Sequence, residues 1–354
     1  MTKAAELAKI GEVATNSQIG GRRNIVINGG MNVAQRSTGV TGVDGAGYYT
    51  HDRWKIEMGS TAGRFTQQQT ADGPNGISAN CLKLSCTTAD ASIAADEYTI
   101  ISQKFEGQDL QSIGKGVAGA KEITVSFYVK ANAAFTFGVE LEDLDNTRQI
   151  TKLYATTTDW VRHELTFPAD VDDGSSPFDD DNASSLVLLF WLHAGATYTG
   201  GTLNTASWAD NTNANRVAGI DSFYSSTDNN FFITGVQMEV GSVATPFEHR
   251  SFGEELALCQ RYYYDPKLSS GNYWWLHPVV TDSTGSYRRG SFPLPTAMRA
   301  DPTATLTGAT NGTFASSMPA VEGNDHRHYI GLAGDTSGED QYADIRSLTL
   351  DAEL

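Results

Sequence analysis

The sequence predicts an all-β protein, on three observations. Thirty-five of the 354 residues are glycine, and threonine, serine, asparagine and aspartate are abundant, a composition typical of short strands joined by turns. Apolar segments recur between residues 24 and 250 at the spacing expected of a β-sandwich. Long helical patterns are nearly absent, so we expect helix only in a few short stretches.

The length suggests about two domains, and a hydrophobic content of 40% is enough for a sizeable core. The patterns divide the chain into an N-terminal helical segment (1–23), a sandwich domain (24–250), a connector helix (251–263) and a smaller C-terminal β domain (264–354).

We expect strands in the sandwich domain at 24–28, 53–58, 64–70, 81–87, 97–104, 122–130, 134–141, 160–167, 185–192 and 230–240. The segment 122–130 alternates cleanly, which predicts one buried face. The segment 185–192 is continuously apolar and predicts a central strand covered on both faces. The acidic segment 170–182 and the segment 197–221, which lacks strong periodicity, predict long loops. Such loops usually bind a ligand, form an interface or are disordered.

Two short helices are predicted. In the first segment Leu7, Ile10 and Ala14 follow helical spacing before Gly20 and Gly21. One apolar stripe of this size does not stabilise a lone helix, so we expect it to pack on the body, a sister chain or a docking partner. The second helix is the connector, where Leu256, Cys259 and Tyr263 share one face.

Composition also narrows the classes of partner. The formal net charge of −17 argues against nucleic-acid binding, because a phosphate backbone needs a basic surface. The N-terminus lacks the apolar core of a signal peptide and no segment has transmembrane length, so we expect folding in the cytoplasm without membrane insertion.

The three cysteines predict no disulfide. Cys81 and Cys86 are five apart in one expected strand and therefore face opposite ways. Cys259 lies in the connector helix and is expected to be a buried small hydrophobe.

Three segments carry a resemblance to a known family: FFITGVQMEVGSVATPFE at 231–248, NIVINGGMN at 24–32 and YTHDRW at 49–54. Over roughly 24–263 the chain resembles a jelly-roll module that is common in bacteriophage tail and virion-surface proteins and is similar to carbohydrate-binding modules. The helical run EELALCQRYY at 254–263 also follows the jelly-roll in the phage proteins that the chain resembles.

The resemblance implies a phage tail-fibre or receptor-binding protein with three copies per assembly. Residues 1–23 would attach it to other virion proteins, and the C-terminal domain with distal loops would contact a host glycan or protein. A head-decoration protein or tail spacer without host binding is the alternative. A minor alternative is a glycan depolymerase. Its acid/base candidates would be Glu140, Glu142 and Asp143 if they face a cleft.

Aromatic residues are the ligand-binding candidates, because the C–H faces of a sugar stack on such rings. Trp54, Trp160 and Trp191 fall in expected strands and are predicted to be core. Trp208 lies in the long loop with no strand of its own, and the run Tyr273, Trp274 and Trp275 is the densest aromatic cluster; packing remains the alternative for both. As neighbours in a strand, Trp274 and Trp275 would face opposite ways.

No cofactor is predicted, although two kinds of metal site remain as hypotheses. The acidic loops 170–174 and 179–182 could bind calcium, or be solvated. Related sugar-binding jelly-rolls often hold calcium with acidic residues in the last strand, and the matching segment 233–236 has no carboxylate. His326 and His328 would point to one side of a strand, where three copies around an axis could bind one metal; a polar surface strand is the alternative.

The sequence contains no Gly-x-Ser-x-Gly elbow, no His-Glu-x-x-His motif and no phosphate loop. We therefore expect a binding or structural protein that is not an enzyme.

Overall fold

The computed structural model describes residues 22–171, 176–266, 274–276, 280–281, 287–307, 310–311, 320–322, 329–335, 343–345 and 347–354. The chain divides into two compact units, Met1–Ser251 and Phe252–Leu354. In the described residues no helix is both long enough and apolar enough to span a membrane.

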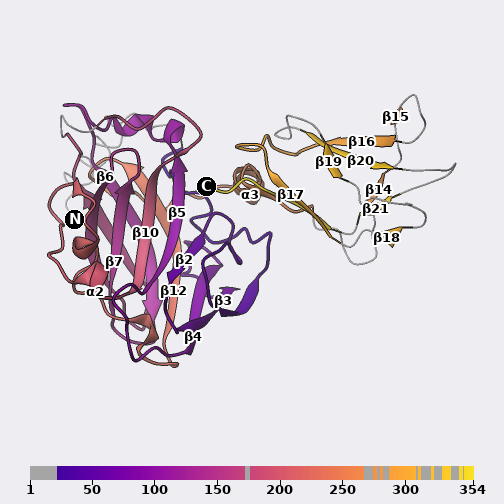
Figure 1. Ribbon diagram of the computed structural model, residues 1–354. Helices are drawn as coiled ribbons and strands as arrows, with labels where there is room; N and C mark the ends of the chain where they lie inside the picture. The colour runs from indigo at the N-terminus through magenta and orange to yellow at the C-terminus, as the bar shows by residue number, and fades with distance from the viewer. Residues whose placement is uncertain are drawn as a thin grey trace. The chain divides into compact units, whose positions relative to one another are not determined.

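The first unit is a jelly-roll-like sandwich of two six-stranded antiparallel sheets, as predicted (Figure 1). The first sheet has the order β1-β3-β4-β12-β6-β9, with β1 Gly39–Val43, β3 Arg64–Thr70, β4 Cys81–Thr88, β12 Asn230–Val240, β6 Ile123–Ala131 and β9 Val161–Phe167. The second sheet has the order β11-β8-β7-β10-β5-β2, with β11 Ala209–Asp210, β8 Arg148–Ala155, β7 Thr136–Asp143, β10 Ser184–Ala194, β5 Tyr98–Glu106 and β2 Lys55–Gly59. The connections contain the short helices η1 Gly107–Asp109, η2 Gln111–Ile113, α2 Ala196–Thr199, η3 Asn213–Asn215 and η4 Phe223–Ser225.

The strand expected at 24–28 is absent, and that prediction was wrong. The backbone of Asn28 adopts the left-handed conformation (φ 58°), which a strand does not tolerate. The neighbouring Ile27 N–H donates to the side chain of Gln103 (2.8 Å) and not to a strand partner. Three strands that the sequence did not predict, β1, β8 and β11, lie at or next to sheet edges.

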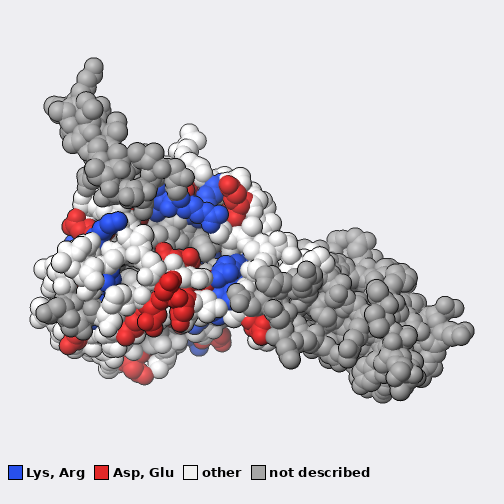
Figure 2. Space-filling view, turned by 90° about the horizontal axis from the view of Figure 1, so that it is seen from above, with Lys and Arg blue, Asp and Glu red and all other residues white. Residues whose placement is uncertain are grey.

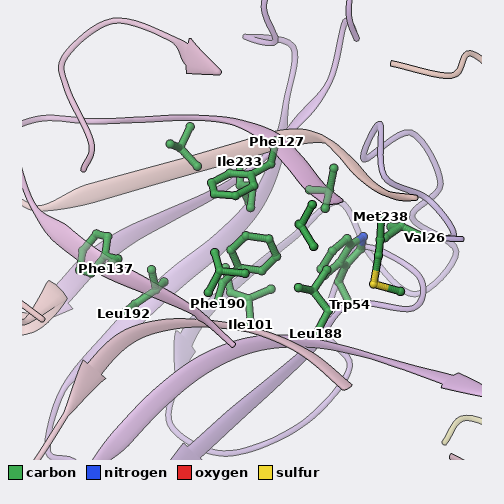
Figure 3. Close-up of a cluster of buried hydrophobic side chains, with 14 of the residues drawn as sticks. Val26, Trp54, Ile101, Phe127, Phe137, Leu188, Phe190, Leu192, Ile233 and Met238 are labelled. Atoms are coloured by element: carbon green, nitrogen blue, oxygen red, sulfur yellow. The ribbon is translucent and has the colours of Figure 1, made fainter. Parts of the chain in front are cut away.

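The core fills the space between the two sheets (Figure 3). The central strand β10 sends Leu186, Leu188, Phe190 and Leu192 into it, all without exposed surface. The ring of Phe190 contacts three aromatic rings, among them that of Phe127 with a centroid distance of 5.1 Å. Burial at about 25 cal/mol per Å² makes this layer the main stabilising term of the unit.

Side chains near residue 250 bind the backbone near residue 24, and these contacts form the terminal clamp. The carboxylate of Glu248 accepts hydrogen bonds from the backbone N–H groups of Arg23 (2.9 Å) and Asn24 (2.6 Å). The guanidinium of Arg250 donates to the carbonyl of Val26 (3.0 Å) and to that of Asn24. Residues more than 220 positions apart in the chain therefore lie side by side.

The second unit begins with helix α3 (Phe252–Gln260), in which Cys259 is buried as predicted. All three cysteines are buried free thiols. In the described residues of this unit, three small antiparallel sheets follow, with the orders β13-β22-β17, β14-β21-β18 and β15-β16-β20-β19. Their strands are β13 Tyr263–Tyr264, β14 Trp274–Leu276, β15 Val280–Thr281, β16 Tyr287–Pro293, β17 Thr303–Thr307, β18 Thr310–Asn311, β19 Ala320–Glu322, β20 Tyr329–Asp335, β21 Ala343–Ile345 and β22 Ser347–Asp351.

Candidate functional site

The outer face of the second sheet presents side chains in rows that run across the strands. In one row Lys104 of β5 pairs with Val187 of β10, which pairs with Glu142 of β7. Two residues further along β10, Leu189 pairs with Ser102 and Glu140, and the next such residue, Trp191, pairs with Ile100 and Gly138. Side chains directly opposite each other in antiparallel strands point to the same face, so these rows form one surface.

A groove of about 270 Å³ follows this face. The volume is near the lower end of the range of roughly 300–1,000 Å³ that is usual for small-molecule sites. Its lining consists of Glu57, Tyr98, Ile100, Lys104, Glu142, Leu144, Val187, Leu189, Trp191, Tyr198, Asn213 and Arg216. The floor is apolar and the sides carry charged and hydroxyl groups.

Three aromatic rings meet at one end of the groove. The ring of Tyr198 lies 5.5 Å from that of Tyr98 and 5.4 Å from that of Trp191, measured between centroids. Trp191 is only 1% exposed, whereas both tyrosines are half-buried. Neither tyrosine hydroxyl has a hydrogen-bond partner among the described residues, which leaves both for a ligand.

One arginine joins the wall of the groove to the sheet. The guanidinium of Arg216 donates from Nε to Glu140 Oε2 (3.1 Å) and from NH2 to Glu142 Oε2 (2.7 Å), and lies over the ring of Trp191 (5.1 Å). The indole N–H of Trp191 donates to Glu140 Oε2 (2.6 Å). Burial outweighs these favourable contacts and raises the pKa of Glu140 from 4.5 to about 7.

The long connection from β10 through α2 to Arg216 forms that wall. The N–H of Val217 donates to the carbonyl of Tyr198 (3.0 Å), which ties the two ends of the wall together. The side chain of Val217 is fully buried against Gly138, where an added Cβ would come within 3.0 Å of Val217 Cγ1. Glycine at this position therefore lets the wall approach the sheet closely and holds Tyr198 at the groove.

Trp208, a ligand-contact candidate with packing as the alternative, is packed in the structure. Its side chain is 7% exposed and belongs to the core cluster, and its indole N–H donates to the carbonyl of Pro168 (2.9 Å). The residue precedes β11, the edge strand that pairs with β8. The unpredicted edge strand is the reason, because it turns the indole inward.

Two of the three tryptophans predicted to be core are confirmed, and one is not. Trp54 and Trp191 are buried. Trp160 is half-buried on the first sheet, where its N–H donates to the carbonyl of Asp72 (3.0 Å) and its ring meets that of Phe232 (6.3 Å). It directly precedes β9, an edge strand, and so has no neighbouring strand to cover it.

Several sequence candidates lie outside what the structure describes. These are Leu7, Ile10 and Ala14 of the attachment segment, Tyr273 of the aromatic cluster, and His326 and His328. Trp274 and Trp275 are consecutive residues of strand β14, and their side chains are outside the described set.

The acidic loop at 170–174 begins in an ion-pair network that contains its own cation. Asp170 is paired with Arg148 (3.0 Å), and the buried ammonium of Lys115 lies 2.5 Å from Asp143 and 3.7 Å from Asp170. Lys115 also donates to the carbonyl of Ser176 (3.1 Å). Across the described residues, no group of three or more potential ligands is placed to hold a metal ion.

The carboxylates proposed as an acid/base pair are committed to other partners. Glu140 and Glu142 do meet the groove wall, but Glu140 has no exposed surface and both are bound to Arg216. Asp143 is buried against Lys115. A glycosidic oxygen in the groove could not reach Glu140 without displacing the arginine.

A serine, a histidine and a glutamate also lie in contact with one another, and the sequence did not predict this cluster. His193 lies 2.8 Å from Ser222 Oγ through Nδ1 and 3.2 Å from Glu97 through Nε2. The histidine is fully buried, which lowers its pKa, and Ser222 Oγ also accepts from Tyr224 N–H (3.1 Å) to cap η4. The cluster joins the segment that begins η4 to β10 and to the residue that precedes β5.

On the face drawn in Figure 2, the described charged groups do not form a continuous basic surface. Figure 2 shows acidic side chains near the middle of one face and basic ones around them. On the described part of that face the basic groups are not continuous, which agrees with the net charge.

No family model matches the chain. No curated protein matches it either.

Solved structures that resemble it include carbohydrate-binding modules. One, described as "CBM4 structure and function", has a TM-score of 0.30 at 10% identity and covers 60% of this chain and 97% of its own. A second, TmCBM61 in complex with β-1,4-galactotriose, has a TM-score of 0.30 at 10% identity and covers 62% of this chain and 99% of its own. A third is the family 11 module of a cellulosomal cellulase of Clostridium thermocellum, with a TM-score of 0.28 at 12% identity and coverages of 55% and 90%. The likeness is one of fold.

Proposed function

We propose that the protein binds glycans, and that the groove on the second sheet is the site. The observation that carries the proposal is the pair of half-buried tyrosines, Tyr98 and Tyr198, at one end of a groove with an apolar floor and polar sides. Sugar rings offer apolar C–H faces for such rings and hydroxyl groups for polar walls.

The test is binding of the full chain to a panel of polysaccharides, with Tyr98→Ala and Tyr198→Ala. Each variant should weaken binding about tenfold, because each removes one stacking surface. Tyr128→Ala, a half-buried tyrosine on the other sheet, is the matched control and should bind as the wild type does. Unchanged binding in both groove variants would place the site elsewhere, and no binding by the folded wild type would contradict the proposal.

We further propose that this glycan-binding unit is part of a bacteriophage particle, as a trimeric fibre that meets the host surface. The resemblance of residues 24–263 to virion-surface jelly-rolls supports this proposal. Display in several copies would raise the avidity of a single weak sugar site. The apolar stripe Leu7, Ile10 and Ala14 would attach the chain to the particle.

Light scattering of the purified protein and antibody labelling of purified particles test this second part. A trimer mass and labelling of the tail support it. Deletion of residues 1–23 should abolish incorporation into particles while glycan binding persists. A monomer, or incorporation without residues 1–23, would contradict the respective part of the proposal.

A further inference from the structure

One charged side chain in the groove has no counter-charge in contact with it. Lys104 lies on β5, in the row with Val187 and Glu142, and is half-buried in the lining of the groove. In the described part of the chain, no hydrogen bond or ion pair reaches its ammonium group.

The other charged groups of the groove are already paired. Arg216 is bound by Glu140 and Glu142, and Glu142 also accepts from Asn211 Nδ2 (2.5 Å). Glu57 is paired with Lys55 (2.9 Å). Glu57 and Glu142 act on Lys104 only from beyond ion-pair distance.

The surroundings of Lys104 disfavour an unpaired positive charge. Burial lowers its pKa, and repulsion from Lys55 lowers it further. A half-buried ammonium in this position gains from a bound anion, which replaces the lost hydration and offsets the repulsion.

The groove also fixes how far this charge is from the aromatic end. Tyr98, Ile100 and Lys104 all line the groove from β5, and Tyr98 and Lys104 are six residues apart. At about 3.3 Å per residue, their Cα atoms are separated by about 20 Å. A sugar stacked on Tyr98 and an anion at Lys104 therefore belong to different residues of one oligosaccharide lying along the strand.

We propose that the ligand is an acidic oligosaccharide, whose carboxylate pairs with Lys104 while another of its sugar rings packs against Tyr98 and Tyr198. This rests on the glycan-binding function proposed above. It adds the ligand's charge, its orientation along β5 and the residue that selects it.

The experiment compares acidic polysaccharides with neutral forms of the same backbone. The probes are polygalacturonate against its methyl ester and alginate against carboxyl-reduced alginate, with xylan and β-1,4-galactan as further neutral glycans. Titration with the full chain should show about tenfold tighter binding to the acidic member of at least one pair. Raising the salt concentration should reduce this preference, because ion pairs are screened.

Variants then assign the preference to Lys104. Lys104→Met should abolish the preference and Lys104→Arg should keep it. Lys83→Met, the same change on the other sheet, should leave it intact. Equal affinity for acidic and neutral members would overturn the inference and leave glycan binding standing. An acidic preference that survives in folded Lys104→Met would also overturn it. Failure of the folded wild type to bind any probe would count against both the inference and the proposed function.

Discussion

Replacing Glu140 by glutamine should remove a pH dependence of stability that comes from one buried carboxyl group. Glu140 has no exposed surface and its pKa is raised from 4.5 to about 7 by burial. The folded state therefore binds this proton more tightly than the unfolded state does. Its contribution to stability is fully present below pH 4.5 and is lost as the pH rises to about 7.

The size of the effect follows from the same two values. A difference of one pKa unit corresponds to about 1.36 kcal/mol, so the rise from 4.5 to about 7 corresponds to about 3 kcal/mol of unfolding free energy. The glutamine side chain keeps the shape and can still accept from Trp191, but it does not titrate. Relative to the variant, the wild type should lose about 3 kcal/mol between pH 4.5 and pH 8.

Urea unfolding of both proteins at several pH values measures this difference. Groups that titrate in both proteins, such as His51, cancel when the two free energies are subtracted. A wild-type minus variant difference that stays constant from pH 4.5 to pH 8 would show that Glu140 is charged throughout and would refute the argument from burial.

Three further results are expected. Phe190→Ala should lower the unfolding free energy by about 3–5 kcal/mol in urea, because it empties the centre of the core, whereas Ile93→Ala at an exposed position (46%) should change it by less than about 0.5 kcal/mol. His51 is buried with its pKa lowered to about 3, so the wild type should lose about 1.4 kcal/mol per pH unit as the pH falls from 6.5 towards 3, and His51→Gln should flatten that part of the pH profile in thermal melts. Trp208→Ala should lower the melting temperature without weakening glycan binding by the folded protein, since its indole is core; weaker binding in titrations with folded variant would restore it as a contact residue.

The sandwich could be predicted from the sequence because period-2 alternation and long apolar strands are local signals. The strand 185–192 shows this best: even-numbered residues such as Leu188 face the core, and Val187, Leu189 and Trp191 form the floor of the groove. The continuous apolar run predicted that both faces of this strand are covered, and the side chains on both faces are buried.

The groove could not be predicted, because its parts come from segments far apart in the chain. Tyr98 lies at the start of one strand and Tyr198 in a connection without strong periodicity. The burial of two tryptophans could not be predicted for a similar reason. Whether Trp160 and Trp208 are covered depends on which strands lie at the sheet edges, and edge position is a property of the sheet order. In the sequence, the apolar residues on both faces of β10 were the available indication that one face of this strand forms the floor of a groove.

The terminal clamp determines how the first unit would respond to mechanical load. The backbone at residues 23–26 is held to the segment near residue 250 by the side chains of Glu248 and Arg250. Tension that separates these two segments would act on these few hydrogen bonds first. The same adjacency makes the segment 24–250 suited to circular permutation, because a short linker could join residues 24 and 250 and new ends could be opened at an exposed turn.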